Sequence, residues 1–145
     1  ITPMHNEKLF ITNSNGYDAT VYIHADPTKT QAGQRHYIHA EEVASALLFL
    51  LNHEDIKVNI NNDIKCPKFN ICGLEEVDNL SLAKMIAAAQ GKELNYEMVD
   101  FHSSRPGHDL RYAMSGEYLK SLGWEPSISL EEGITKTVNW FKARN

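Results

Sequence analysis

Helix-like and strand-like patterns alternate irregularly along the 145 residues, and this alternation limits the folds open to the chain. Apolar side chains recur with the period of a helix in the longer stretches, while the shorter stretches between them are rich in β-branched and aromatic residues. Asn79 and the Ser129–Glu132 capping box mark helix starts, and Gly91 and Gly123 mark helix ends. We therefore expect a small α/β domain with mixed strand pairing, not a full doubly wound sheet. The expected helices are residues 41–51, 79–90, 115–122 and 129–141, and the expected strands are residues 20–24, 68–72 and 94–99.

The long expected helices each have an apolar face, and we expect these faces to form the core. We also expect Trp124 and Trp140 to be core aromatics, and Cys72 to be a small buried side chain rather than a redox or metal residue. Lys136 and Lys142 are expected on a solvated helix face. The apolar faces consist of Val43, Ala46, Leu47, Leu50 and Leu51, then Leu82, Met85, Ile86 and Ala89, and finally Ile134, Val138 and Phe141.

The composition is that of one globular domain. With 42% hydrophobic residues the chain can bury a core, and its net charge of −5 does not attract nucleic acid by bulk electrostatics. Two cysteines are too few for a disulfide scaffold and fit the reducing cytosol, so we expect a cytoplasmic protein. The longest apolar run, residues 43–51, is far shorter than a membrane span. The first residue is Ile1 rather than Met, so we expect a piece of a longer protein.

The segment most suggestive of chemistry gathers two arginines, a histidine and a tyrosine within residues 105–112. Pro106 and Gly107 favour a turn, and a residue before proline is kept out of helical geometry. Arg105 can therefore aim its guanidinium at phosphate oxygens, and Asp109 can hold a neighbouring arginine or histidine. A surface turn with a local Arg–Asp ion pair is the alternative interpretation, and the residues alone leave it open.

Residues 104–113, Ser-Arg-Pro-Gly-His-Asp-Leu-Arg-Tyr-Ala, resemble a signature of dTDP-glucose 4,6-dehydratases and related extended short-chain dehydrogenase/reductase proteins. Three further segments agree with the same family, in the same order along the chain. They are Arg-His-Tyr-Ile-His at 35–39, Phe-Asn-Ile-Cys-Gly at 69–73 and Leu-Gly-Trp-Glu-Pro at 122–126. The chain is therefore similar to the C-terminal, substrate-binding part of an NAD-dependent nucleotide-sugar epimerase or dehydratase.

The resemblance implies how a nucleotide-diphosphate sugar binds. In the family two arginines grip the diphosphate, a lysine adds a phosphate contact, an asparagine and a histidine line the substrate pocket, and a tyrosine packs near the base. In that order the matching residues here are Arg35 and Arg105, Lys8, Asn70 and His108, and Tyr22.

The catalytic and cofactor-binding motifs of the family do not occur in this sequence. No tyrosine is followed by lysine four positions later, and neither Gly-x-Gly-x-x-Gly nor Gly-x-x-Gly-x-x-Gly occurs to cradle a dinucleotide. The resemblance thus implies a substrate-binding domain at residues 20–145, preceded by a poorly patterned segment at 1–19. It also implies a separate N-terminal NAD-binding domain as partner. We expect the chain itself to bind no NAD and to hold no catalytic residue.

Several functions stay open on the sequence alone. By resemblance the full enzyme is a 4,6-dehydratase that oxidises the sugar at C4 with NAD, eliminates water across C5–C6 and returns the hydride. An epimerase of the same superfamily is one alternative. A standalone binding or interaction module is another, and it would self-associate through the face left bare by the NAD domain. A zinc site at His36 and His39 is disfavoured, because that spacing on an extended segment puts the two side chains on opposite faces.

Overall fold

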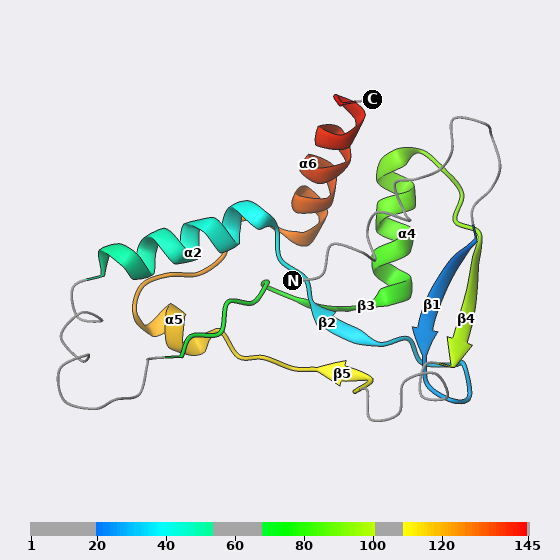
Figure 1. Cartoon of the computed structure of the whole chain (residues 1–145), viewed down its shortest axis with the longest axis horizontal. Coiled ribbons are helices and arrows are strands. Elements are labelled where there is room, and N and C mark those ends of the chain that lie inside the picture. The colour runs from blue at the N-terminus through cyan, green and yellow to red at the C-terminus, as the bar shows by residue number, and fades with distance from the viewer. Residues whose placement is uncertain (1–19, 54–67, 101–108, 145) are drawn as a thin grey trace.

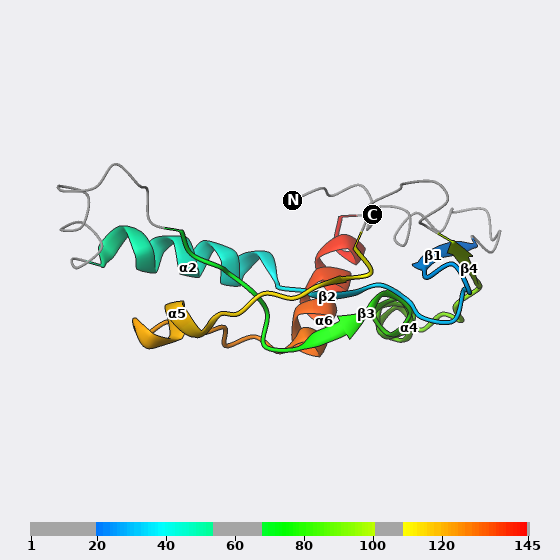
Figure 2. The same cartoon turned by 90° about the horizontal axis from the view of Figure 1, so that it is seen from below.

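The computed structural model describes residues 20–53, 68–100 and 109–144, and its elements form a larger and a smaller lobe (Figures 1 and 2). Helices α4 and α6 lie in the larger lobe, and α2 and α5 form the smaller one. Within the described ranges no helix has the length and apolar character needed to cross a membrane. In chain order the elements are β1 (Val21–Ala25), β2 (Gln34–His36), α2 (Ala40–Asn52), β3 (Glu76–Asp78), α4 (Asn79–Gln90), β4 (Tyr96–Asp100), β5 (Arg111–Tyr112), α5 (Glu117–Ser121) and α6 (Leu130–Lys142).

The strands form two small sheets (Figure 1). β1 and β4 pair in parallel, from Val21 opposite Tyr96 to Ala25 opposite Asp100. β2 is the centre of the second sheet, where it pairs antiparallel with β3 and parallel with β5. This combination of parallel and antiparallel pairs confirms the mixed α/β fold expected from the sequence.

The larger lobe has its core between α4 and α6, on the faces that the helical period predicts. Burying these side chains supplies most of the hydrophobic stabilisation of the lobe, at roughly 25 cal/mol for each Å² of apolar surface. Tyr37 and Val77, beside or within the second sheet, are partly buried against the same core. The four residues at its centre, each at most 8% exposed, are Leu82 and Ile86 of α4 and Ile134 and Val138 of α6.

The ends of these helices follow the capping signals with one difference. Ser129 Oγ accepts from the amide three residues on, at 3.2 Å, and α4 stops at Gly91, whose φ is +70°. The N-cap of α4 is Asp78 rather than Asn79, and its Oδ1 accepts from the amides two and three residues on, both at 2.9 Å. Asn79 becomes the first residue of the helix, which leaves its side chain free to bind elsewhere.

The smaller lobe packs α2 against α5. Ala46 of α2, Leu119 of α5 and Trp124 form its buried centre. The Trp124 indole donates to Ser45 Oγ at 3.1 Å, so this tryptophan is a core aromatic, as expected. Cys72 is buried, as expected, and burial raises the pKa of its thiol.

The strand expected at residues 68–72 is wrong, because this segment has no regular secondary structure. Alternate side chains of the segment nevertheless pack against the smaller lobe, as those of a strand would. Phe69 and Ile71 pack on the core of the smaller lobe, and the Phe69 ring stacks on Tyr118 with 5.5 Å between centroids. A strand also needs a neighbouring strand to bond with, and the described residues place none beside this segment.

Two expectations about helix faces are also wrong. Leu47 and Leu51 of α2 are 51% and 69% exposed, because α2 is apolar on two sides and only the side carrying Ala46 meets α5. Trp140 is 50% exposed, because it lies two residues beyond the buried Val138 and therefore on the far side of α6.

Two acidic residues at the start of α2 connect the lobes. Glu41 pairs with Lys136 of α6 at 3.0 Å, on the exposed face where that lysine was expected. Glu42 is 3% exposed, and its Oε1 accepts from the Ser127 amide at 3.0 Å, the Ser127 hydroxyl at 2.8 Å and the Ile128 amide at 2.7 Å. Burial raises the pKa of Glu42, but these hydrogen bonds outweigh burial and hold it below the ordinary value of 4.5.

Replacing Glu42 should destabilise the fold. Glu42→Ala removes the acceptor of three partly buried hydrogen bonds, so we expect the free energy of unfolding to fall by about 1–3 kcal/mol, measured by urea denaturation followed by tryptophan fluorescence. Glu42→Gln keeps one acceptor oxygen and should lose less. Glu41→Ala, at the exposed neighbour, is the matched control and should change stability little.

The same residue should make stability depend on pH. The folded pKa of Glu42 lies below its unfolded value, so its contribution is present above about pH 4.5 and is lost as the pH falls through the folded pKa. The wild-type protein should therefore lose more stability in acid than Glu42→Gln. Equal acid sensitivity of the two proteins would contradict this role.

Candidate functional site

Arg35, in the middle of β2, is held by the main chain at the start of β5. Its Nη1 donates to the carbonyl oxygens of Gln34 and Leu110, at 2.6 and 3.1 Å, and its Nη2 donates to that of Asp109 at 3.3 Å. The guanidinium carbon lies 4.1 Å from the centroid of the Tyr112 ring, which is a cation–π contact. These contacts use three of the five N–H donors of an arginine, and they fix the plane of the guanidinium.

Strand register and one glycine explain how Arg35 reaches this position. Arg35 and Tyr112 are direct partners in the parallel pair of β2 and β5, so the guanidinium lies over the neighbouring ring. Gly33 precedes β2 at a close approach of three segments. A Cβ there would lie 3.2 Å from Asn79 Nδ2 and 3.3 Å from the Leu110 carbonyl oxygen. A larger residue would push on the backbone that Arg35 binds.

Tyr37 and Asn79 form a polar contact on the same side of the sheet. The Tyr37 hydroxyl donates to Asn79 Oδ1, which fixes the ring against the start of α4. Burial raises the pKa of the Tyr37 phenol, so it stays protonated and acts as a donor near neutral pH.

An arginine on the neighbouring strand β5 has a different partner. Arg111 donates to both carboxylate oxygens of Glu76, from Nε and Nη2, each at 2.7 Å. This two-point ion pair reaches from β5 across β2 to β3, and it lowers the pKa of Glu76. An Asp109–Arg111 pair was one expectation, and the structure gives the arginine to Glu76 instead. Nothing in the local sequence indicates Glu76, because the pairing depends on strand order.

The Asn70 side chain binds the C-terminal end of residues 109–115, whose N-terminal end is bound by Arg35. Its Nδ2 donates to the carbonyl oxygen of Ser115 at 3.3 Å. Arg35 holds the carbonyls of Asp109 and Leu110, so these two predicted substrate residues anchor opposite ends of residues 109–115. Both side chains therefore position the chain that directly follows the 101–108 stretch.

Tyr22 belongs to the other sheet, and its side chain is 61% exposed on β1. The loop after β1 is organised by Asp26, whose Oδ1 accepts from the amides of Thr30 and Gln31, both at 2.7 Å. Hydrogen bonds, first of all from the Gln31 amide, lower the pKa of Asp26 to about 2. Residues 26–31 thus form an ordered turn.

A hollow of about 470 Å³ separates this turn from β5. Both polar and apolar residues line it. The side chains that bound it include those of Thr30, Gln31, Gln34, Ser81, Met98 and Arg111.

Three predicted site residues, Lys8, Arg105 and His108, lie outside the described residues. Arg35, Asn70 and Tyr22 are described, and the structure brings the first two to one segment while Tyr22 lies on β1. The convergence of Arg35 and Arg105 on one diphosphate therefore stays a prediction.

No group of three or more His, Cys, Asp or Glu side chains that could hold a metal ion occurs within residues 20–53, 68–100 and 109–144. The two histidines weighed for zinc have separate places. His39 is the N-cap of α2, where its Nδ1 accepts from the Glu41 amide at 3.3 Å. His36 lies in β2, and its buried Nδ1 has no hydrogen-bond partner in the part of the chain that the structure describes.

Comparison with known proteins gives relatives rather than a family model, because no family model matches the chain. The chain is 33% identical to the dTDP-D-glucose 4,6-dehydratase of Mus musculus over 113 residues, covering 75% of this chain and 29% of that protein. It is 32% identical to a low-salt glycan biosynthesis protein of Haloferax volcanii over 142 residues, covering 94% of this chain and 40% of that protein. The chain thus spans well under half the length of these curated relatives.

Solved structures agree. A dTDP-glucose 4,6-dehydratase from Bacillus anthracis, in complex with NAD, superposes with a TM-score of 0.62 and 25% identity, over 86% of this chain and 35% of that one. The UDP-glucose 4-epimerase of Thermus thermophilus superposes with a TM-score of 0.71 over 98% of this chain and 40% of that one, and at 22% identity it shows a shared fold. By sequence and fold together, the chain belongs to the NAD-dependent nucleotide-sugar epimerase/dehydratase family of the extended short-chain dehydrogenase/reductase superfamily, with dTDP-glucose 4,6-dehydratases among its relatives.

Proposed function

We propose that this chain is the substrate-binding part of a nucleotide-sugar 4,6-dehydratase, and that it grips the diphosphate of the sugar nucleotide. The observation that carries the proposal is the setting of Arg35. Its guanidinium is fixed by three main-chain carbonyls and one ring, beside the segment that continues from Arg105. Relatives named as dTDP-glucose 4,6-dehydratases are 30–37% identical to this chain over 83–113 residues.

The charges around Arg35 and Arg111 support this choice. Arg111 is neutralised by the Glu76 carboxylate, which takes both of its forked donors. Arg35 binds neutral carbonyl oxygens and therefore keeps its net positive charge. Its Nε–H and one Nη2–H have no partner among the described residues, and together they form the fork that suits a phosphate. Of the two, Arg35 is the one suited to an anion.

Chain length limits how far Arg105 can lie from this point. Arg105 and Asp109 are four positions apart, so even a fully extended chain spans at most about 14 Å between their Cα atoms. The carbonyl of Asp109 is bound by Arg35 itself, at 3.3 Å. A diphosphate carries oxygens on both phosphates, so two arginines supplied by separate segments can each bind one of them.

The chain supplies binding and orientation rather than the chemical step. NAD, which a separate domain would hold in our proposal, would supply the hydride acceptor for the sugar when bound. The residues described here fix the diphosphate and thereby the position of the sugar ring, which lowers the entropy cost of reaction. An epimerase of the same family can use the same diphosphate grip.

The outer face of α2 is suited to contact the NAD-binding domain. Ala44, Leu47, Leu48 and Leu51 recur at positions i, i+3, i+4 and i+7, and the three leucines are 51–69% exposed. A helix that is apolar on two sides is normally covered on both. In our proposal the NAD-binding domain covers this side, and in its absence two copies of the chain pair through it. Leu48→Glu should abolish any concentration-dependent sedimentation of the purified chain, while the exposed control Lys142→Glu should leave it unchanged.

Loss of Arg105 should weaken sugar-nucleotide binding. We expect Arg105→Ala to reduce the affinity for dTDP-glucose or UDP-glucose by about 1.5–3 kcal/mol, as removal of a charge-assisted phosphate contact does, measured by titration calorimetry. Arg144→Ala is the matched control, because Arg144 stacks on Trp140 at the end of α6, 3.8 Å from its ring centroid. Unchanged affinity in Arg105→Ala would remove that residue from the site.

Arg35→Lys should separate positioning from charge. Lysine keeps the positive charge but cannot hold three carbonyls in one plane, so amide hydrogen exchange in residues 109–115 should accelerate by about fivefold, the effect of losing roughly 1 kcal/mol. Sugar-nucleotide affinity should fall with it. Exchange at the wild-type rate would show that Arg35 does not hold this segment.

The purified 145 residues, supplied with NAD and dTDP-glucose, should give no turnover. The tyrosine–lysine pair and the dinucleotide turn of the family are missing from the sequence. Formation of a 4-keto-6-deoxy sugar nucleotide by this chain alone, detected by mass spectrometry, would refute the division of labour proposed here.

A further inference from the structure

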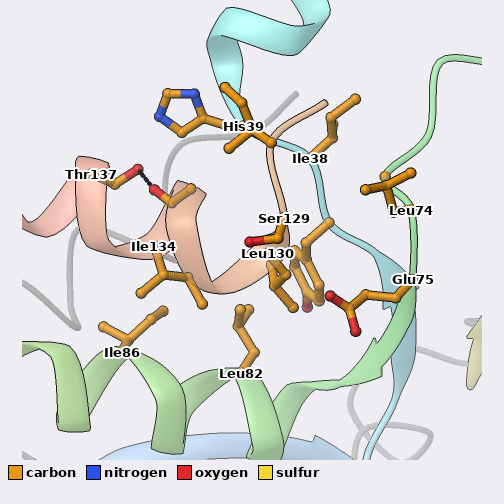
Figure 3. A pocket seen from close by; sticks show the side chains of 14 residues that line it. Ile38, His39, Leu74, Glu75, Leu82, Ile86, Ser129, Leu130, Ile134 and Thr137 are labelled. Carbon is orange, nitrogen blue, oxygen red and sulfur yellow. Dashed lines mark hydrogen bonds between the residues drawn. The ribbon is translucent and has the colours of Figure 1, made fainter. Parts of the chain in front are cut away.

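We propose that a hollow between α4, α6 and the start of α2 binds a small apolar molecule that carries a cationic amine. The hollow has a volume of about 110 Å³. Figure 3 shows its walls: Leu82 and Ile86 rise from α4, and Leu130 and Ile134 face them from α6. None of Tyr22, Arg35 or Asn70 lines it, so the proposal is independent of the sugar-nucleotide site.

The walls favour an apolar ligand of about one ring. Leu82, Ile86 and Ile134 belong to the buried core of the larger lobe, so the hollow is an extension of that core to the surface. An engineered cavity of about 150 Å³ with similar aliphatic and aromatic walls stays dry and binds benzene. A hollow of about 110 Å³ that is partly open can take a ring of that size with a short substituent at its mouth.

The hydroxyl groups of the three wall residues Tyr37, Ser129 and Thr137 already have partners. The Tyr37 hydroxyl donates to Asn79 Oδ1, and Ser129 Oγ accepts from the Glu132 amide at 3.2 Å. Thr137 Oγ1 donates to the Gly133 carbonyl at 2.7 Å, the bond drawn dashed in Figure 3. Because these three hydroxyl groups need no water to satisfy them, filling the hollow with an apolar ligand leaves each of them paired.

Glu75 gives the hollow its preference for charge. Its exposed side chain lines the hollow, and the carboxylate is directed toward the side where Leu130 lies (Figure 3). No hydrogen bond or ion pair engages this carboxylate among the described residues, in contrast to Glu76, which is fully paired with Arg111. An unpaired anion beside an apolar wall complements an apolar body that ends in a cation.

Three probes of nearly equal size test the proposal: benzylamine, toluene and benzoate. Each is titrated into the full 145-residue chain, and backbone amide shifts of residues 128–137 are followed by NMR. We expect all shifts to map to the hollow, with benzylamine binding best and benzoate worst, the two differing by about fivefold, as expected for one exposed charge pair replaced by repulsion.

Two variants give the controls. Glu75→Gln should make benzylamine bind no better than toluene while leaving toluene unchanged, and Thr137→Phe should fill the hollow and block all three. The Glu75 comparison does not depend on whether Thr137→Phe folds. Absence of any saturable shift, or equal affinities for benzylamine and benzoate in the wild-type protein, would overturn the proposal.

Discussion

The short strand β2 is the constraint on which the rest of the described structure depends. It pairs with β3 on one side and β5 on the other, and so joins segments that lie more than thirty residues apart in sequence. Its central side chain, Arg35, binds the main chain of the β5 segment, and the Glu76–Arg111 ion pair reaches over it from β3 to β5. A three-residue strand offers few ladder hydrogen bonds, so these charge-assisted contacts carry much of the register.

Much of the fold was predictable because its signals are local. The Ser129 cap, the Gly91 stop and the apolar faces of α4 and α6 depend on side chains within one or two turns, and the structure confirms them. The failures at residues 68–72 and on α2 involve partners that are distant in sequence. The segment 68–72 has strand-like composition but no neighbouring strand in the described part of the chain, and periodicity did not show which side of α2 would be covered.

The candidate site divides in the same way. Motif matching selected Arg35 and Asn70. In the structure both side chains donate hydrogen bonds to backbone carbonyl oxygens of residues 109–115. The partners of Glu76 and Asn79 were not foreseen, because the first depends on strand pairing and the second on where α4 begins. Composition can suggest that an arginine binds phosphate, but only the identity of its neighbours shows whether its charge is still available.

That distinction explains how one small sheet can use two arginines in two different ways. An arginine paired with a carboxylate, as Arg111 is, acts as a cross-link between strands and presents little net charge to solution. An arginine bound to carbonyls, as Arg35 is, is equally well fixed, but its charge is not cancelled. Exchanging these partners would leave the number of hydrogen bonds nearly unchanged and would remove the positive field from the site. In our proposal, the pairing of Glu76 with Arg111 rather than with Arg35 therefore matters to anion binding, even though Glu76 need not touch the ligand.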